Sequence, residues 1–256
     1  MSASKKCSFR FYAELNDFLP KNKQFKTFAY SFNLNPSVKD AIEAVGVPHP
    51  EVDLILVNNK SVSFNYHLNN DDFISVYPVF ELLDITNVTR LRPKPLRKTK
   101  FILDVNLGRL AKKLRLLGFD SVYCNSFSNK EIIDTAIKED RIILTRNIGL
   151  LKNSRITHGY WIRSAEVTKQ TVEVLKKYDL YTSFHPYSLC MDCNGIIIPA
   201  AKNEIEHLLP TNTKKLFNEF FLCSDCNKVF WKGSHYKKMN EFIKDIKETD
   251  NKCTIG

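Results

Sequence analysis

The sequence lacks a run of apolar residues long enough to cross a bilayer, so we expect no membrane-spanning helix and no membrane partner. Its first residues lack the apolar core of a secretion signal, so we expect a cytoplasmic protein. No solenoid-type repeat is evident. What is present is a chain of 256 residues with 43% hydrophobic side chains. A chain of this length is enough for two domains of ordinary size, or for two small domains and a metal-held module.

Negative charge is scarce after the first third of the chain. Residues 1–89 carry 8 Lys and Arg against 10 Asp and Glu, whereas residues 90–256 carry 30 against 18. A positive field of this size favours polyanionic partners such as nucleic acids. If the charge served general solubility alone, we would expect it to be spread along the chain.

Cysteine is also sparse, yet four of the seven cysteines form two closely spaced pairs in the last third of the chain. Two disulfides or four buried thiols are the alternatives to a metal site. A reducing compartment disfavours the first alternative, and the paired spacing disfavours the second. Four thiolates match a closed, structural zinc site, and we predict a zinc ribbon over residues 185–239. The predicted zinc ligands are Cys190, Cys193, Cys223 and Cys226.

Residues 1–89 show the order of elements of a β-grasp domain. Strands are predicted over residues 7–12, 25–32, 53–57 and 72–77, with a helix over residues 38–45. This order resembles the ubiquitin-like sulphur-carrier proteins, whose chemistry requires a free terminal Gly-Gly. The present chain continues past Pro78 and ends without Gly-Gly, so a docking module for a protein partner is predicted instead.

Residues 90–100 contain six basic residues and two prolines without apolar periodicity, which is typical of a linker. A polyanion could lie along it, or it could be a solvated spacer. From residue 101 the pattern alternates between strands and helices, which predicts a parallel-sheet α/β domain over residues 101–184. The remaining residues, 240–256, are predicted to form a tail with a helix over residues 240–248.

Polar side chains follow two of the predicted parallel strands. Asp104 comes directly after the first predicted strand of this domain, residues 101–103, and Asn147 follows the third, residues 141–145. Glu131 and Asp134 share one face of the second predicted helix, residues 129–138. Such oxygen donors suit Mg²⁺ or Mn²⁺, with Asp104 and Glu131 as the first ligands. Alternatively, Glu131 belongs to a capping box and Asp134 pairs with a lysine one turn later.

Basic residues occupy the helix that follows Asp104, and aromatic side chains are interleaved with lysines around the second cysteine pair. Aromatic rings among cations suit stacking on unpaired bases and contact with phosphates. For Trp231, packing around the metal site is an equally good interpretation. The residues predicted to bind RNA are Arg109, Lys112, Lys113, Arg115, Arg146, Trp231, Lys232 and His235.

Three motifs together resemble the Mut-seven carboxy-terminal RNase family: FILDVNLGRLAKKLRLLGFD at residues 101–120, RIILTR at 141–146, and FWKGSH at 230–235 beside the cysteine pairs. The resemblance implies a PIN-like nuclease domain and a zinc ribbon, often preceded by a ubiquitin-like domain. It implies that Asp104 and Glu131 are metal-binding acids of a ribonuclease.

The chain departs from the family pattern at Asn129 and Asn147, where the family usually has aspartate. Each replacement removes one negative charge from the expected metal site, so the affinity for the ion should be reduced. The resemblance therefore predicts a metal-dependent ribonuclease, with a catalytically degenerate RNA-binding adaptor as the alternative.

Overall fold

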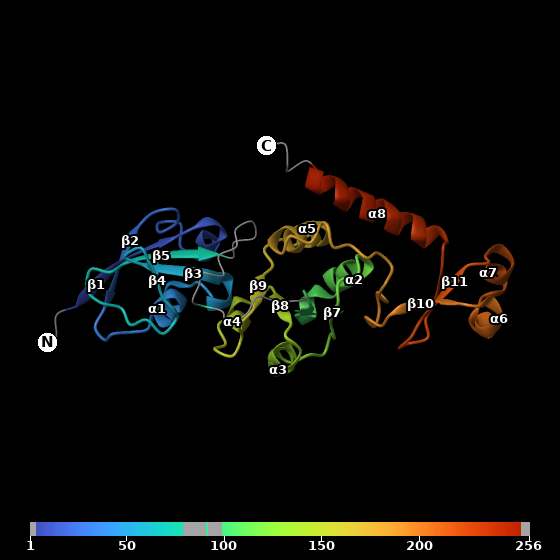
Figure 1. The fold of residues 1–256 in the computed structure, drawn as a ribbon, viewed down its shortest axis with the longest axis horizontal. Helices are drawn as coiled ribbons and strands as arrows, with labels where there is room; N and C mark the ends of the chain where they lie inside the picture. Colours follow the sequence, from blue (N-terminus) through green and yellow to red (C-terminus); the bar gives the residue numbers. More distant parts are fainter. Residues whose placement is uncertain (1–3, 79–90, 92–98, 252–256) are drawn as a thin grey trace. The chain divides into compact units, whose positions relative to one another are not determined.

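The computed structural model describes residues 4–78, 91 and 99–251 (Figure 1). These residues divide into two compact units. The first unit contains residues 1–98 and 136–161, and the second contains residues 99–135 and 162–256. Most of the predicted basic linker lies outside the described residues. No helix in the described ranges is both long enough and apolar enough to span a bilayer.

The amino-terminal part is the predicted β-grasp domain. Its five strands lie in the order β2-β1-β5-β3-β4, with β1 parallel to β5 in the middle. Phe9, Ile42, Ile55 and Ile74 are fully buried in its core. The bounds are β1 Lys5–Phe11, η1 Ala13–Phe18, β2 Phe28–Phe32, α1 Val38–Val45, η2 His49–Glu51, β3 Val52–Val57, β4 Lys60–Ser61 and β5 Phe73–Pro78.

The sequence predicts helix α1 well because its ends are marked locally. The Ser37 hydroxyl accepts a hydrogen bond from the Asp40 N–H at 3.1 Å, and Gly46 ends the helix with a φ of 123°. Strand β2, in contrast, begins only at Phe28, three residues later than predicted. Phe25 has a φ of 57°, a left-handed conformation that no strand contains.

Residues 136–161 pack against the β-grasp domain within the same compact unit. His49 Nε2 lies 2.7 Å from the Ile156 carbonyl oxygen, and a Glu51 carboxylate oxygen accepts a hydrogen bond from the Trp161 N–H. The Phe18 and Trp161 ring centroids are 5.1 Å apart. The sequence did not predict this contact, which joins part of the α/β segment to the β-grasp domain.

The α/β segment pairs its strands in parallel, as predicted. Strand β6 pairs with β7, and β8 pairs with β9. A short helix, α4, follows β8 and was not predicted. The bounds are β6 Phe101–Leu103, η3 Val105–Leu107, α2 Gly108–Leu116, β7 Ser121–Val122, α3 Asn129–Glu139, β8 Ile142–Thr145, α4 Ile148–Leu151, β9 Gly159–Trp161 and α5 Val167–Lys177.

Helix α2 buries the apolar stripe that its spacing predicts: Leu107, Leu110, Ala111, Leu114 and Leu117 are at most 1% exposed. The helix ends where Gly118 adopts a φ of 94°, which allows the chain to pass close to the His185 backbone.

Replacement of Gly118 by alanine is expected to lower the free energy of unfolding by about 2 kcal/mol, because a side chain disfavours this backbone conformation and the site is overpacked. The added Cβ would lie 2.3 Å from the His185 carbonyl oxygen. Urea denaturation measures the change. Gly149→Ala is the control, since its Cβ would meet only the Asn147 side-chain oxygen, at 3.1 Å. Equal stability of Gly118→Ala and the unmodified protein would contradict the prediction.

The carboxy-terminal region contains a three-stranded antiparallel sheet in the order β10-β11-β12. One face of it packs on a small core that includes Ile205, Leu209 and Phe220. The last helix begins at Ser234 instead of residue 240 and so crosses the predicted boundary at residue 239. The bounds are β10 Ile197–Ala200, α6 Lys202–Ile205, η4 Glu206–Leu208, α7 Thr211–Leu216, β11 Phe220–Cys223, β12 Val229–Trp231 and α8 Ser234–Asn251.

Candidate metal centre and acidic site

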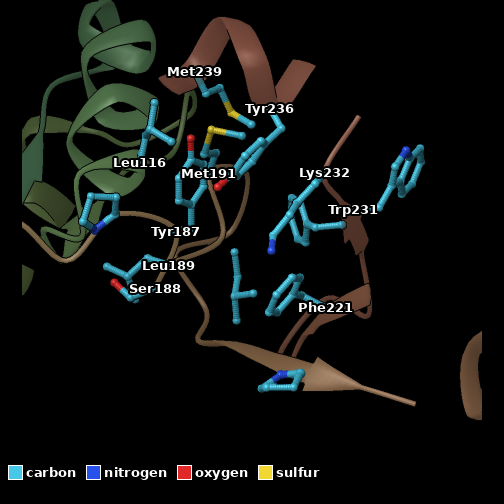
Figure 2. Close-up of a pocket in the computed structure, with 14 residues that line it drawn as sticks. Leu116, Tyr187, Ser188, Leu189, Met191, Phe221, Trp231, Lys232, Tyr236 and Met239 are labelled. Carbon is cyan, nitrogen blue, oxygen red and sulfur yellow. The ribbon is translucent and has the colours of Figure 1, made fainter. Parts of the chain in front are cut away.

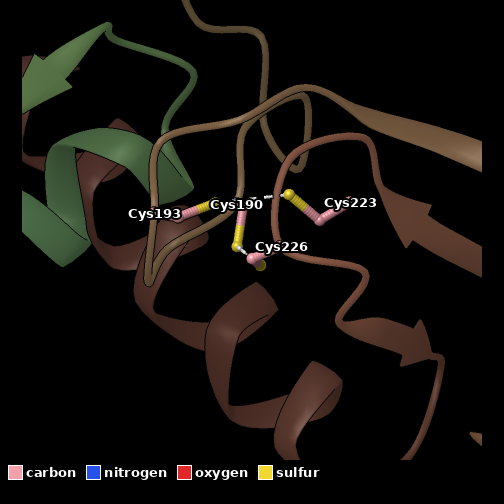
Figure 3. Close-up of side chains that lie close together, drawn as sticks. All are labelled: Cys190, Cys193, Cys223 and Cys226. Carbon is pink, nitrogen blue, oxygen red and sulfur yellow. Dashed lines mark hydrogen bonds between the residues drawn. The ribbon is translucent and has the colours of Figure 1, made fainter.

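The four cysteines of the two predicted pairs come together at one point (Figure 3). The Sγ atoms of Cys190 and Cys226 are 3.8 Å apart, those of Cys193 and Cys223 are 3.3 Å apart, and all four lie within 4.8 Å of one another. A tetrahedral ion with zinc–sulphur bonds of about 2.3 Å needs its sulphurs about 3.8 Å apart. The group could therefore hold a metal ion such as zinc.

Two turns with the same hydrogen-bond pattern present these thiols. In the first, the Asn194 N–H donates to the Cys190 carbonyl oxygen at 2.9 Å; in the second, the Asn227 N–H donates to the Cys223 carbonyl oxygen at 3.1 Å. Both asparagines have a positive φ, 75° and 56°. Asparagine tolerates this conformation better than most residues. The repeated sequence Cys-x-Asp-Cys-Asn encodes the repeated turn.

The thiols differ in acidity because their surroundings differ. Burial raises the pKa of Cys193 to about 12. Burial would also raise the pKa of Cys223, but hydrogen bonds from the backbone N–H groups of Cys226 and Asp225 lower it to about 7. A metal requires deprotonated thiolates, so binding of a divalent cation would release protons from this group.

The first of these turns is attached to the start of β7 and to the residue before it through a side chain that the sequence analysis missed. Asn194 Oδ1 accepts a hydrogen bond from the Ser121 N–H at 2.9 Å, and Asn194 Nδ2 donates to Asp120 Oδ1 at 2.7 Å. The sequence contained a weak signal for this role, since asparagine follows the last cysteine of both pairs.

Arg115 completes the attachment from inside the protein. Its side chain donates to three backbone carbonyl oxygens, those of Ser121 at 2.8 Å, Met191 at 3.0 Å and Asp192 at 2.8 Å. Only 2% of the residue is exposed. Burial also lowers its pKa from the usual value for arginine. An arginine enclosed in this way has no surface to offer to RNA, so the predicted RNA contact by Arg115 is replaced by a structural role.

The other basic residues of helix α2 have varied surroundings. Lys112 forms an ion pair with Asp192 at 3.0 Å, and Lys228 pairs with the same carboxylate. The Lys113 ammonium lies 3.5 Å from the centre of the Phe242 ring. Arg109 is exposed, as is Arg146 after strand β8. RNA contacts by these residues stay predictions.

Trp231 is half-buried and packs against the small core of the ribbon that includes Ile205 and Phe220. Its indole points away from the neighbouring aromatic side chains (Figure 2). The packing interpretation therefore explains Trp231. Lys232 is exposed and pairs with Glu219, and His235 is exposed in the first turn of α8.

Asp104 lies directly after strand β6 and is only 6% exposed. Its Oδ1 atom accepts a hydrogen bond from the Val105 N–H at 2.7 Å, so the side chain also caps the 3₁₀ turn that begins helix α2. Ligands of parallel sheets collect at the carboxyl ends of the strands, and Asp104 occupies that position after β6. Asp104 is therefore the best candidate for a functional acid.

Two of the other predicted oxygen donors, Glu131 and Asn147, cap helices. Glu131 Oε2 accepts hydrogen bonds from the Ser128 N–H at 2.8 Å and the Ser128 hydroxyl at 2.7 Å, which lowers the pKa of this fully exposed carboxyl. This is the capping box that the sequence predicted as the alternative. Asn147 Oδ1 accepts a hydrogen bond from the Gly149 N–H at 3.0 Å and caps α4.

Asp134 is half-buried on helix α3. It lies in the same compact unit as Asp104 and Glu131, whereas Asn147 lies in the other. Among the described residues, one group of potential metal ligands (Cys, His, Asp or Glu) lies close enough together to hold a metal ion, and it consists of the four cysteines. Convergence of the four oxygen donors on one ion therefore stays a prediction.

The architecture is that of a β-grasp domain followed by an α/β domain with a four-cysteine ribbon. The Mut7-C RNAse domain model matches residues 99–243, more than half of the chain, and the Mut7-C ubiquitin model matches residues 4–84. The chain therefore belongs to the Mut7-C RNAse family. No curated protein and no solved structure matches it.

Proposed function

We propose that this protein is a metal-dependent ribonuclease that hydrolyses phosphodiester bonds of RNA. The observation that carries the proposal is Asp104, an almost fully buried carboxylate at the carboxyl end of β6 within the segment that matches the RNAse domain. Ligands in parallel-sheet domains collect at this end of the strands. The proposed ligands of Mg²⁺ or Mn²⁺ are Asp104 and Glu131, with Asp134 of the same compact unit as a further catalytic residue.

A bound divalent ion would polarise the phosphodiester and lower the pKa of an attacking water. The residues of the chain itself have simpler tasks. Asp104 places a negative charge at the end of β6, where its hydrogen bond to the Val105 N–H fixes the orientation of the carboxylate. Arg146 and Arg109 are exposed cations that would attract the RNA backbone and orient it.

For the four cysteines we propose a structural zinc ion, because four thiolates leave no coordination position for water or substrate. A reducing compartment such as the cytoplasm would keep these thiols available. For the β-grasp domain we propose docking of a protein partner, in keeping with the match to a ubiquitin-like model.

Asp104→Asn is expected to slow cleavage of a labelled single-stranded RNA in Mn²⁺ at least about a hundredfold. Asparagine keeps the oxygen that accepts from the Val105 N–H, so the turn is retained while the charge is lost. Asp140→Asn is the matched control, since Asp140 is exposed and has a left-handed φ of 52° that asparagine tolerates. Equal cleavage rates of the Asp104 variant and the unmodified protein would remove Asp104 from the site.

One observation favours a second candidate, an RNA-binding adaptor without catalytic activity. Glu131, one of the proposed metal ligands, already serves as a helix cap, and so does Asn147, which the sequence analysis predicted as a catalytic residue. Moreover, position 147 is an amide and not a carboxylate. If the protein is an adaptor, Asp104→Asn and the unmodified protein should bind RNA with the same affinity. Neither should cleave the RNA in Mn²⁺ or Mg²⁺. The cleavage assay, run beside a binding titration, separates the two candidates.

A further inference from the structure

A pocket of about 290 Å³ lies in the second compact unit. It is bordered by the three-stranded sheet β10-β11-β12, here called the ribbon sheet, by the start of helix α8 and by the segment before the first cysteine pair. This volume is at the small end of the range of about 300–1,000 Å³ that is usual for ligand sites. Seven of its lining residues carry aromatic rings or thioethers (Figure 2). They are Tyr187, Met191, Phe221, Phe230, Trp231, Tyr236 and Met239.

The ribbon sheet presents two different faces, and the pocket occupies one of them. Phe220 and Trp231 are opposite each other in the register and pack on the small core of the ribbon, and Trp231 also borders the pocket. Phe221 and Phe230 are the next opposite pair, so they share the other face, where they line the pocket. Both rings are half-buried. The pocket thus uses a sheet face that the ribbon's own small core does not cover.

Two tyrosines form the wall opposite this face. The ring centroids of Tyr187 and Tyr236 are 4.9 Å apart with an angle of 31° between the planes, and the Tyr187 hydroxyl donates to Asn240 Oδ1 at 2.7 Å. Burial raises the pKa of Tyr187 to about 12, so the phenol stays neutral at physiological pH. This hydrogen bond anchors one ring, while Tyr236 in the first turn of α8 stays half-exposed.

Positive charge gathers beside the apolar lining. Residues 231–240 contain Lys232, Lys237 and Lys238 and no acidic residue. Lys232 lines the pocket, and its side chain extends toward the space between Tyr236 and Phe221 (Figure 2). Its ion pair with Glu219 is exposed on both sides, so a phosphate could replace the carboxylate at little cost.

We propose that this pocket binds one unpaired nucleobase of an RNA strand, with the adjoining phosphates near Lys232 and the other two lysines. The inference rests on the proposed function, because it assumes that RNA is the substrate or ligand. Flat aromatic walls suit a base, which stacks without regard to sequence, and ammonium groups at the edge suit the backbone that every nucleotide carries. An apolar side chain of a protein partner would use the rings but would have no need for the three lysines.

The test is a binding titration of the zinc-loaded full chain with a fluorescent single-stranded RNA and with the same backbone carrying abasic nucleotides, without Mg²⁺ or Mn²⁺. Tyr236→Ala is expected to weaken binding of the RNA about tenfold and to leave binding of the abasic strand unchanged. Tyr236→Phe keeps the ring and should stay within about twofold of the unmodified protein. Phe25→Ala, which removes an aromatic ring that is 69% exposed on the β-grasp domain, is a further control.

A second variant covers the case that Tyr236→Ala does not fold. Met239→Glu places a carboxylate in the pocket from a helical position and should weaken RNA binding at least as much, whereas Met239→Gln should have a smaller effect. Bound zinc and the circular dichroism spectrum show whether each variant is folded.

Tight RNA binding that neither pocket variant changes would overturn the pocket assignment and leave the proposed ribonuclease intact. A protein partner as occupant predicts this result. Equal weakening of RNA and abasic strand would also overturn it, because the pocket would then act only through charge. If the unmodified protein bound neither strand, the proposed function itself would fall and the nucleobase pocket with it.

Discussion

Cys190→Ser is expected to abolish stoichiometric zinc binding and to unfold the ribbon. Cys190 is completely buried, and its Sγ is part of the four-thiol group. Structural zinc contributes about 10–16 kcal/mol of apparent binding free energy in small metal-held modules, far more than the few buried apolar side chains of the ribbon can replace. The ribbon core includes only three buried apolar residues, Ile205, Leu209 and Phe220. The metal content of the purified chain and limited proteolysis within residues 185–239 measure the two effects.

Cys124→Ser is the matched control, since Cys124 is a half-exposed thiol outside the four-cysteine group. It should retain one zinc ion per chain and the proteolysis pattern of the unmodified protein. Removal of the metal with a strong chelator should reproduce the Cys190→Ser result. One equivalent of zinc retained by Cys190→Ser would contradict the assignment of this cysteine as a ligand.

Arg115→Met is expected to lower the free energy of unfolding by about 3–5 kcal/mol. Methionine fills a similar volume but donates no hydrogen bond, so the carbonyl oxygens of Ser121, Met191 and Asp192 would lose their charged donor. Each buried acceptor left without a partner costs about 1–3 kcal/mol. Because two of the three carbonyls lie inside the first cysteine pair, zinc affinity should fall as well. Urea denaturation and a competition assay with a zinc indicator measure the two effects.

Lys112→Met tests whether the effect of Arg115→Met comes from burial or from loss of positive charge. Lys112 lies on the same helix and pairs with Asp192, but 60% of its side chain is exposed. An exposed ion pair contributes less than about 1 kcal/mol. The stability of Lys112→Met should therefore stay close to that of the unmodified protein. A similar loss in both variants would show that charge on helix α2, and not the buried hydrogen bonds, determines the stability.

Elements with local signals were predictable from the sequence. Helix α1 has Ser37 at its start and Gly46 at its end, and helix α2 has its apolar stripe and Gly118. The Ser128–Glu131 capping box was also visible as a short-range pattern. In each case the residues that decide the structure lie within a few positions of one another, so the spacing alone carries the information.

Three features escaped the sequence analysis because their partners are remote in the chain. Arg115 reads as one more surface cation of a basic helix, and only the approach of Met191 and Asp192, 76 and 77 positions away, buries it. Residues 136–161 show no local sign that they pack against His49 and Glu51. The start of α8 was missed because FWKGSH looks like one motif, whereas the helix begins inside it at Ser234.

The sequence by itself determined the order of the domains and the parallel pairing of strands in the α/β segment. It also identified the four cysteines as one group. Periodicity and paired spacing are properties of neighbouring residues, so these features need no knowledge of tertiary contacts. Only the tertiary structure decided which cations are buried, which face of the ribbon sheet lines a pocket, and that Asn194 ties the first cysteine pair to β7. These outcomes depend on where distant segments meet, and burial or hydrogen bonding between them is set by packing of the whole chain.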